Sequence, residues 1–315
     1  MNILVTGSCG FLGSHLVKRL LKEGHHVIGI DNLLTGDRNN CPRDPNFRFV
    51  WHDVIEPIHF DEVEQIYHLA CPASPPAYKL DPIHTVKTCF MGTLNMLELA
   101  KKTGARMLFT STSEVYGDPL RHPQNEDYWG NVNPNGERSC YDEGKRVAET
   151  LVTDYNRMHG TNTAIVRIFN TYGPGMNPDD GRVMTNFITQ TLRGEPMTIY
   201  GNGKQTRCFQ YVDDTIEGLV RMMDSGLRGP INIGNPNEYT IKQLAKVVNP
   251  HGRVIHLPGT SDDPKRRKPD ITLAKSLLRW EPTVSLKEGI KEMMNYYSNE
   301  VRVRRELARE PGSGS

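Results

Sequence analysis

The sequence predicts an α/β protein with a doubly wound parallel sheet and a smaller C-terminal lobe. Short apolar strands alternate with amphipathic helices through the first half, a pattern typical of parallel sheets covered on both faces. Beyond residue 170, glycine and proline become frequent and the elements shorter. We therefore expect a first domain at 1–170, joined by a returning helix near 212–225. Residues 171–308 form mainly the smaller lobe, which we expect to bind substrate, and 309–315 read as an added linker.

The first elements also carry the first functional signal. An apolar strand at 3–5 runs into Gly7, Gly10 and Gly13, which open a helix predicted at 11–23. Such glycines allow a tight turn, let the backbone approach a pyrophosphate, and present the first helical amides to its charge. An ordinary strand-to-helix turn is the alternative. The next strand, 26–30, ends in Asp31, whose carboxylate can bind both ribose hydroxyls and repel a 2′-phosphate. The arrangement is that of a Rossmann domain and favours NAD over NADP.

The same alternation continues along the chain. We expect further strands at 47–51, 65–69, 106–110 and 163–168. Apolar residues at helical spacing predict helices at 83–101, 141–158 and 213–223.

The composition excludes several classes of protein. The chain has 315 residues, 37% of them hydrophobic and 24% charged, with a net charge of +1. This balance gives no general attraction to nucleic acid or to a membrane, and no apolar run is long enough to span a bilayer. The first strand begins at residue 2, so we expect no signal peptide and a cytoplasmic protein.

The cysteines suggest neither a metal site nor a disulfide framework. Six are spread widely along the chain, without a C-x-x-C pair. We expect reduced, mostly buried thiols and no bound metal.

Two groups of polar residues are candidates for catalysis. Tyr141 and Lys145 are four residues apart on a predicted helix, so they share a face. A nearby ammonium and a positive nicotinamide both favour phenolate, so we expect the pKa of Tyr141 to fall toward neutrality. Thr112, Ser113 and Glu114 follow an apolar strand, at the edge where doubly wound sheets bind ligands. A surface tyrosine and a polar turn are the alternatives.

These motifs together resemble the extended short-chain dehydrogenases that act on nucleotide sugars. More narrowly, they resemble the UDP-glucuronate decarboxylases, also called UDP-xylose synthases. The resemblance spans about residues 2–298, and its specific matches are H-L-A-C-P-A-S-P-P at 68–76, S-C-Y-D-E-G-K-R at 139–146, D-G-R-V at 180–183, Q-T-R-C-F-Q-Y-V at 205–212 and D-P-K-R-R-K-P-D at 263–270.

The resemblance implies a reaction without net redox change. NAD⁺ oxidises C4 of UDP-glucuronate, the resulting 4-keto acid loses CO₂, C5 is protonated, and the retained NADH reduces C4 again to give UDP-xylose. It also implies tightly bound, recycled NAD, a homodimer built on helices, and either a cytoplasmic protein or the soluble catalytic domain of a Golgi-anchored form. Part of the apolar stripe Val86, Phe90, Leu94 and Leu97 is expected at the dimer interface.

The motifs and the resemblance together define the predicted site. The catalytic residues are Thr112, Ser113, Glu114, Tyr141, Lys145 and Arg267. The cofactor-binding residues are Gly7, Gly10, Phe11, Leu12, Gly13, Asp31, Asp53, Leu69 and Thr88, with Tyr141 and Lys145. The substrate-binding residues are Asn170, Arg182 and Arg207, with Glu114, Tyr141 and Arg267. Guanidinium suits a carboxylate because it binds as a flat two-pronged fork, although the K-R-R-K run could also be a solvated surface segment.

Other functions on the same scaffold stay open at this point. They are a UDP-glucuronate 4-epimerase, a UDP-apiose/xylose synthase, and another nucleotide-sugar epimerase or dehydratase. A dehydratase should have an Asp-Glu pair where this chain has Ser113 and Glu114, and an epimerase has no need of Arg267. A catalytically silent NAD-binding scaffold is the remote alternative, but it predicts a broken Tyr–Lys pair.

Overall fold

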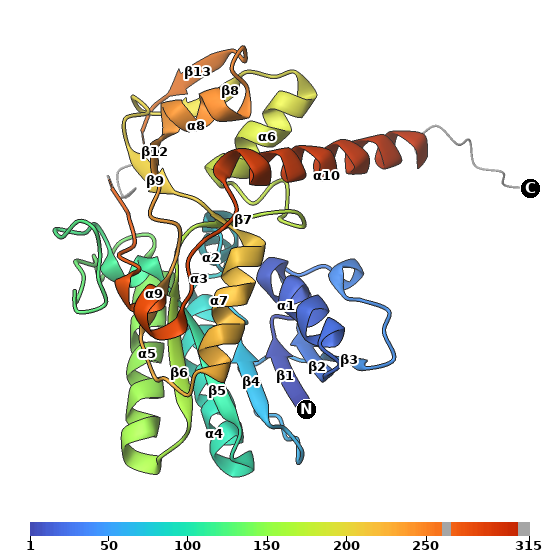
Figure 1. Ribbon diagram of the computed structural model, residues 1–315, viewed down its shortest axis with the longest axis vertical. Helices are drawn as coiled ribbons and strands as arrows, with labels where there is room; N and C mark the ends of the chain where they lie inside the picture. The colour runs from blue at the N-terminus through green and yellow to red at the C-terminus, as the bar shows by residue number, and fades with distance from the viewer. Residues whose placement is uncertain (260–265, 308–315) are drawn as a thin grey trace, which may run out of the picture.

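The computed structural model describes residues 1–259 and 266–307, and within them a seven-stranded parallel sheet forms the centre of the molecule. The strand order is β11-β6-β5-β4-β1-β2-β3. Helices cover both faces of this sheet, and a smaller group of elements lies above the carboxyl ends of its strands (Figure 1). The doubly wound fold predicted from the sequence is confirmed.

The bounds of the elements are as follows. The central strands are β1 (Asn2–Thr6), β2 (His26–Asp31), β3 (Phe47–Trp51), β4 (Gln65–His68), β5 (Arg106–Thr112), β6 (Thr163–Ile168) and β11 (Ile231–Ile233). Short ladders pair β7 (Thr171–Tyr172) with β10 (Gln210–Tyr211), β8 (Met197–Tyr200) with β13 (Val254–Leu257), and β9 (Thr206–Cys208) with β12 (Glu238–Thr240). The helices are α1 (Phe11–Lys22), α2 (Pro75–Leu80), α3 (Pro82–Lys87), α4 (Thr93–Thr103), α5 (Ser139–His159), α6 (Val183–Arg193), α7 (Val212–Asp224), α8 (Ile241–Val248), α9 (Thr272–Leu278) and α10 (Leu286–Leu307).

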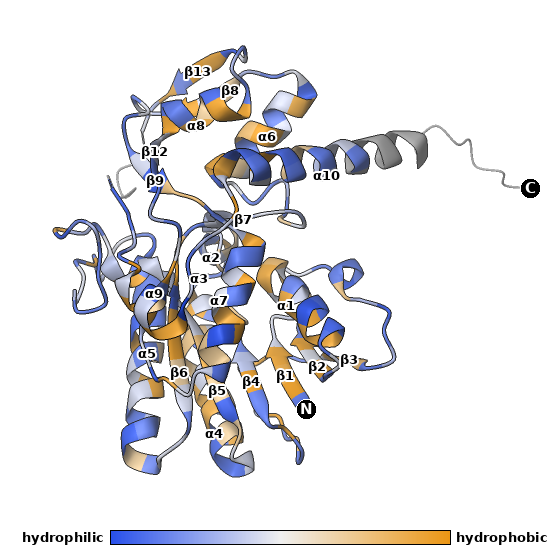
Figure 2. Ribbon diagram, viewed as in Figure 1, coloured by the Kyte–Doolittle hydropathy of each residue, from blue (hydrophilic) through white to orange (hydrophobic). Residues whose placement is uncertain are grey.

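Strand β1 shows why the central strands are continuously apolar. Ile3 and Val5 join the core on the α1 and α7 side, whereas Leu4 joins the core that includes α4 and α5. All three side chains are fully buried. Figure 2 shows the apolar strand β1 beside helices with polar outer surfaces. A strand covered on both faces has no solvent side on which polar residues could alternate.

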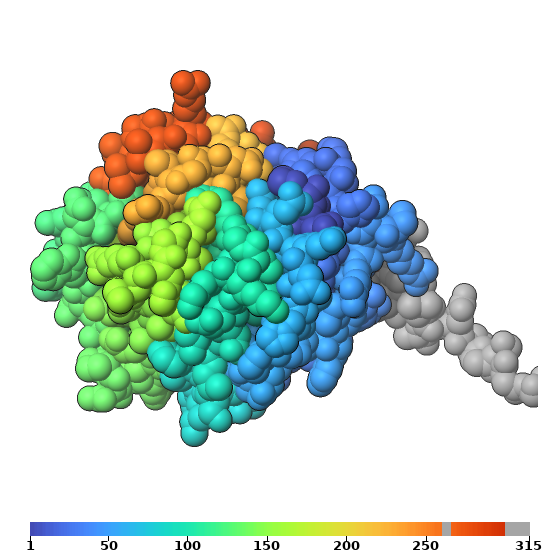
Figure 3. Space-filling view, turned by 90° about the horizontal axis from the view of Figure 1, so that it is seen from below, coloured from blue at the N-terminus to red at the C-terminus, as the bar shows by residue number. Residues whose placement is uncertain are grey.

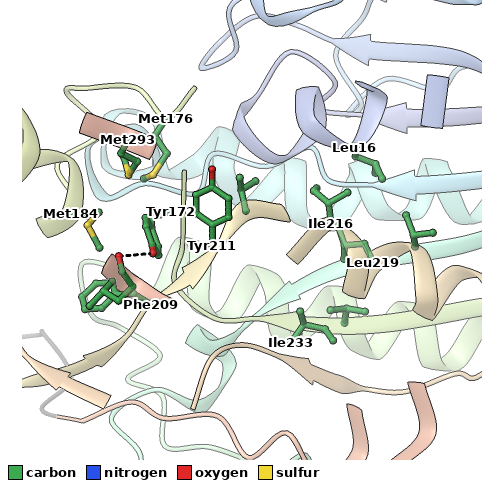
Figure 4. Packing of buried hydrophobic residues seen from close by; sticks show 14 of the residues in the cluster. Leu16, Tyr172, Met176, Met184, Phe209, Tyr211, Ile216, Leu219, Ile233 and Met293 are labelled. Atoms are coloured by element: carbon green, nitrogen blue, oxygen red, sulfur yellow. Dashed lines mark hydrogen bonds between the residues drawn. The ribbon is translucent and has the colours of Figure 1, made fainter. Parts of the chain in front are cut away.

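The core on the α1 side continues into the smaller lobe. It runs from Leu16 of α1 through Ile216 of α7 to Tyr172 and Met293 (Figure 4). Tyr172 donates a hydrogen bond to the carbonyl oxygen of Leu286 at 3.3 Å. The two regions therefore share one apolar core.

Most predicted elements agree with the structure to within a few residues, but the helix predicted at 83–101 is interrupted. The segment forms α3, a π-helical turn at Thr88–Gly92, and then α4. The hydroxyl of Thr88 donates to the carbonyl of His84 at 2.8 Å. A Cβ on Gly92 would lie 2.7 Å from the side chain of Val54, so the backbone packs closely there. The apolar spacing continues through the turn, which hides it from a periodicity argument.

The sheet also contains a strand that the sequence analysis missed. Strand β11 follows much of the smaller lobe and returns to pair in parallel with β6. Helix α9 packs on β11 and α7. From below, these late segments lie against the N-terminal half of the chain (Figure 3). The division of the chain at residue 170 stays a prediction, and the 309–315 tail lies outside the described residues. No helix in the described ranges combines the length and apolarity needed to cross a membrane.

The expectation of reduced cysteines is wrong for one pair. Cys9 and Cys41 form a disulfide with their Cα atoms 5.6 Å apart. They are 32 residues apart in the chain. They meet because β1 and β2 are parallel neighbours, so the segment after β2 lies beside the glycine turn that follows β1. Cys71, Cys89, Cys140 and Cys208 are free thiols. Within the described residues, no cluster of histidine, cysteine or carboxylate side chains could hold a metal ion.

Candidate active site

The strand order places a cavity where the connections of the sheet reverse direction. Strand β1 lies between β2 and β4. The chain adds β2 and β3 on one side of β1, then crosses over and adds β4, β5 and β6 on the other side. Doubly wound sheets bind ligands at the carboxyl ends of such neighbouring strands. A cavity of about 1210 Å³ lies here, and all of the predicted site residues line it. The cavity is larger than a typical pocket for one small ligand, which measures ~300–1,000 Å³.

The glycine turn forms a cradle that side chains would fill. Gly7 has a φ of +70°, and a Cβ there would lie 3.0 Å from the amide nitrogen of Ala70. A Cβ on Gly13 would lie 1.9 Å from the carbonyl oxygen of Gly7. No side chain caps the N-terminus of α1, and its first residues, Phe11 and Leu12, line the cavity. Uncapped helical amides beside open space suit a pyrophosphate, so these residues fit a bound dinucleotide.

The Asp31 carboxylate is fixed at the end of β2. It accepts hydrogen bonds from the backbone N–H groups of Cys9, at 2.9 Å, and Leu33, at 2.8 Å. Burial raises the pKa of Asp31 against the opposing effect of these amides. The group faces the cavity, where its expected role on the ribose stays a prediction.

Asp53, Leu69 and Thr88 also lie on the cavity wall. Asp53 accepts a hydrogen bond from the side chain of Asn32 at 2.9 Å. It also lies 2.9 Å from Nε2 of His84, which donates to it when that nitrogen carries the proton. Burial opposes ionisation of Asp53, but its hydrogen bonds prevail and lower its pKa. The amide of Leu69 donates to the Thr6 hydroxyl at 3.1 Å. Their predicted cofactor contacts are compatible with these positions.

Tyr141 lies in the first turn of α5, at the predicted catalytic position. Its ring stacks on Tyr78, with centroids 5.4 Å apart, and its hydroxyl is hydrogen-bonded to Thr112. Burial, followed by the nearby Cys71, holds the pKa of Tyr141 well above its usual value. The predicted fall in pKa is therefore wrong for the protein alone. Lys145 donates to the carbonyl of Thr110 at 2.9 Å, so its ammonium is held at the end of β5.

Two arginines hold the Glu114 carboxylate. Arg267 donates to one carboxylate oxygen, and Arg138 donates to the other. Burial opposes ionisation of Glu114, but the arginine charges outweigh it and lower its pKa. Ser113, beside Glu114, is also buried. Glu114 and Arg267, two residues of the predicted site, are thus in direct contact, although they are far apart in the sequence.

Arg138 and Tyr78 are site residues that the sequence analysis missed. Both line the cavity. The hydroxyl of Tyr78 is buried without a hydrogen-bond partner among the described residues, and so is Nε of Arg267. A buried donor without an acceptor is costly, so both atoms indicate a place for ligand oxygens. Arg138 precedes Tyr141 by three residues, about one helical turn. That spacing could have indicated that Arg138 lies close to the Tyr141 site.

The predicted substrate residues come from separate loops and strands around the cavity. Arg182, before α6, donates to the carbonyl of Ala73 at 2.9 Å. Arg207, in β9, is buried and donates to the carbonyl of Thr206 at 2.8 Å. Asn170 follows β6 and also lines the cavity. Of the K-R-R-K run, Lys265 lies outside the described residues, as do Asp262 and Asp263.

Asp142 adds a second carboxylate to this charged cluster. Its Oδ2 lies 4.0 Å from Nε of Arg138. Burial, and then the charge of Glu114, raise the pKa of Asp142 to about 7 despite the opposing arginines. In the unfolded chain an aspartate titrates near ~3.9. The native state therefore holds a proton that the unfolded state has lost between these pH values.

This difference predicts how stability depends on pH. The contribution of Asp142 is fully present below about pH 4 and is lost as the pH rises to about 7. Asp142→Asn should therefore raise the melting temperature over that of the unmodified protein by a few degrees at pH 8, and much less at pH 5. Thermal unfolding at both pH values checks this. Asp154→Asn, at a solvent-exposed pair with Arg157, is the matched control. An equal shift at both pH values would rule out the assignment.

Comparisons with known proteins show the family of the chain. Residues 3–234 match the family model described as NAD dependent epimerase/dehydratase family. The chain belongs to this family of NAD-dependent enzymes.

The similar curated proteins are more specific. UDP-glucuronic acid decarboxylase 1 of Arabidopsis thaliana is 58% identical over 308 residues, covering 96% of this chain and 71% of that protein. UDP-glucuronic acid decarboxylase 1 of Danio rerio is 53% identical, covering 95% of this chain and 73% of that protein.

Solved structures share the fold at lower identity. A UDP-glucose 4-epimerase of Thermotoga maritima with UDP-glucose has a TM-score of 0.88 and 31% identity. The match covers 96% of this chain and 100% of the epimerase chain. A UDP-glucuronic acid 4-epimerase of Bacillus cereus, in complex with UDP-glucuronic acid and NAD, has a TM-score of 0.84 and 31% identity. The match covers 95% of this chain and 100% of the epimerase chain.

Proposed function

We propose that this protein is a UDP-glucuronate decarboxylase that forms UDP-xylose and keeps its NAD between turnovers. The observation that carries the proposal is the buried Arg267, which lines the cavity and whose Nε has no hydrogen-bond partner in residues 1–259 and 266–307. An epimerase or dehydratase acting on a neutral sugar has no need of this group, whereas a substrate carboxylate needs it. The decarboxylases at 53–58% identity support the same reading.

NAD fits the glycine cradle, and when bound it supplies a hydride acceptor that later returns the hydride to the substrate. Gly7, Gly10 and Gly13 leave the space for its pyrophosphate. Asp31 at the end of β2 is the group for its adenosine ribose, and Lys145 is the group for its nicotinamide ribose. Retention of NAD is required because the two hydride transfers cancel within one turnover.

Tyr141 is the proposed base for the C4 hydroxyl. Its Oη accepts the hydroxyl proton while the hydrogen bond with Thr112 orients the phenol. In the protein without cofactor, the raised pKa of Tyr141 makes its phenolate form unfavourable. A positive nicotinamide near the phenol is the charge that would favour it. The same phenol can return the proton to the C4 oxygen at the end of the reaction.

Arg267 is the proposed partner of the C6 carboxylate. In the protein alone it donates to Glu114 and to the carbonyl of Gly117, the latter at 2.8 Å. Its free Nε can take one carboxylate oxygen while Arg138 continues to hold Glu114. A ketone at C4 lies beta to this carboxylate, so the electrons released with CO₂ delocalise into an enolate. Ser113 and Glu114 then lie near C5, where a proton must be delivered.

The cationic side chains supply the proposed binding energy for UDP. Arg182 and Arg207 come from different elements and both line the cavity, which suits the charge of a diphosphate. Asn170 is a further ligand in this proposal, and the unpaired hydroxyl of Tyr78 is available to the sugar or its carboxylate.

The test is mass spectrometry of the nucleotide sugars after incubation with UDP-glucuronate and NAD⁺. The proposal expects a product that is lighter by CO₂ and co-elutes with UDP-xylose. An isomer of unchanged mass would contradict it in favour of the 4-epimerase. Lack of any change, with NAD bound, would contradict it in favour of another nucleotide sugar or a silent scaffold.

A homodimer is the proposed assembly. Apolar side chains lie exposed on α2, α3 and the π-helical turn: Leu80, Ile83, Val86, Phe90 and Met91. Leu97 of the predicted stripe is fully buried in the core, whereas Val86 is 42% and Phe90 is 38% exposed. Clustered apolar side chains on a surface favour association. Sedimentation velocity should give twice the chain mass, and a monomer at micromolar concentration would contradict the proposal.

A further inference from the structure

We propose that the disulfide between Cys9 and Cys41 controls how long the protein retains NAD. In this proposal, reduction of the bond loosens the wall of the adenosine site and speeds release of the cofactor. The inference rests on the proposed use of NAD and concerns its regulation by cellular thiols.

Cys9 lies where the parts of the adenosine site meet. It is in the glycine turn, between Gly7 and Gly10. Its amide donates to the Asp31 carboxylate at 2.9 Å. Its carbonyl oxygen accepts from the amide of Asp37 at 3.1 Å and from the side chain of Asn40 at 3.0 Å. Displacing Cys9 therefore disturbs the pyrophosphate turn and the ribose carboxylate together.

Cys41 ends the segment that covers this region. The segment at 32–41 follows β2, and five of its residues line the cavity: Asn32, Leu34, Thr35, Asp37 and Asn40. A Cβ on Gly36 would lie 3.0 Å from the carbonyl carbon of Cys9 and 3.1 Å from the Asp31 carboxylate, so the segment lies directly on both. Strand β2 holds its start, and the disulfide holds its end.

The disulfide thus closes a loop around the proposed cofactor site. The other contacts that hold this end of the segment are non-covalent: the two hydrogen bonds to the Cys9 carbonyl and the stacking of Arg38 on Phe49, 4.4 Å from the ring centre. Without the covalent bond, only these non-covalent contacts oppose opening of the segment, so in our proposal it opens more often. Holding the segment in its closed position lowers the entropy cost of binding NAD, so the bond should raise affinity mainly by slowing release.

The switching chemistry is thiol–disulfide exchange with a small thiol such as glutathione. Two glutathione molecules reduce the bond: the Cys9–Cys41 S–S bond breaks and one S–S bond forms in glutathione disulfide. The two glutathione protons end on the Cys9 and Cys41 thiols. Glutathione disulfide drives the reverse reaction, so the state of the bond depends on the square of the glutathione concentration divided by that of glutathione disulfide.

Thermodynamic linkage provides a second, independent readout. If the disulfide raises the affinity for NAD by some factor, NAD must protect the disulfide against reduction by the same factor. Cys9 is fully buried and Cys41 is 7% exposed, so exchange requires the segment to open. Bound NAD should oppose this opening.

The experiment compares NAD release from oxidised and glutathione-reduced protein, with Cys9–Cys41 bonding verified by peptide mass spectrometry. We expect about tenfold faster release after reduction, equal to ~1.4 kcal/mol if binding rates are unchanged. Cys41→Ser should release NAD at the reduced rate and be insensitive to glutathione. Glutathione titration with and without NAD should give a matching protection factor.

Cys89→Ser is the matched control. It removes the other close sulfur pair, since Cys71 and Cys89 have their Sγ atoms 3.3 Å apart, and it should keep the glutathione response. Equal release rates for oxidised and reduced protein would overturn the inference, as would a response that persists in Cys41→Ser. Decarboxylation is measured separately at saturating NAD. Its absence in both redox states would contradict the proposed function while leaving the retention result interpretable.

Discussion

Arg267→Ala is expected to lower kcat for decarboxylation by roughly 10²–10³-fold, the usual loss when one preorganised charge-stabilising group is removed. The variant lacks the partner of the C6 carboxylate as the 4-keto acid releases CO₂. Binding of UDP should be weakened much less, because Arg182 and Arg207 are unchanged. Product formation by mass spectrometry and UDP affinity by calorimetry measure the two effects separately.

Two further variants protect this result from a folding artefact. Arg267 is buried against Glu114, so its removal can also destabilise the protein. Arg267→Lys keeps the charge but loses the two-pronged geometry, and should fold while remaining slow. Arg266→Ala removes the neighbouring, exposed arginine and should keep its rate. Equal losses of kcat and UDP affinity in Arg267→Lys would contradict the assignment.

Tyr141→Phe is expected to lower kcat by roughly 10²–10⁴-fold, the usual contribution of a positioned acid or base. The substituted ring can still stack on Tyr78, but no atom can accept the C4 hydroxyl proton. NAD should remain bound, since its proposed contacts lie mainly in the glycine turn. Pre-steady-state absorbance at 340 nm should show no transient NADH.

Tyr78→Phe is the matched comparison, because it removes the same atom from the neighbouring ring. The Tyr78 hydroxyl has no hydrogen-bond partner among the residues that the structure describes, and in our proposal it contacts substrate without moving a proton. We expect a raised KM with a nearly unchanged kcat. If Tyr78→Phe lowers kcat as much as Tyr141→Phe, the assignment of Tyr141 as the base is wrong.

Residues that act through local spacing were predictable from the sequence. The apolar run Ile3 to Val5 followed by Gly7 defines a strand and turn within a few residues. Tyr141 and Lys145 lie on one helical face for the same reason. Glu114 and Arg267 are different, because nothing in their spacing predicts that they meet; the resemblance put each of them in the site without pairing them.

Three of the misses involve features that residue spacing does not reveal. Cys9 and Cys41 meet because β2 leads the chain back across the glycine turn, which cysteine spacing cannot reveal. The π-helical turn before α4 keeps the apolar spacing of a helix, so periodicity does not detect it. The fall expected in the pKa of Tyr141 took account of nearby positive charge but not of burial, which dominates in the protein alone.

Strand β11 also determines where the molecule can be cut. It covers the outer edge of β6, although the chain reaches it only after building much of the smaller lobe. A fragment that ends at residue 170 would leave β6 with its backbone donors and acceptors exposed along one side. Unprotected strand edges template association with other chains. Such a fragment should therefore aggregate rather than behave as an autonomous dinucleotide-binding module.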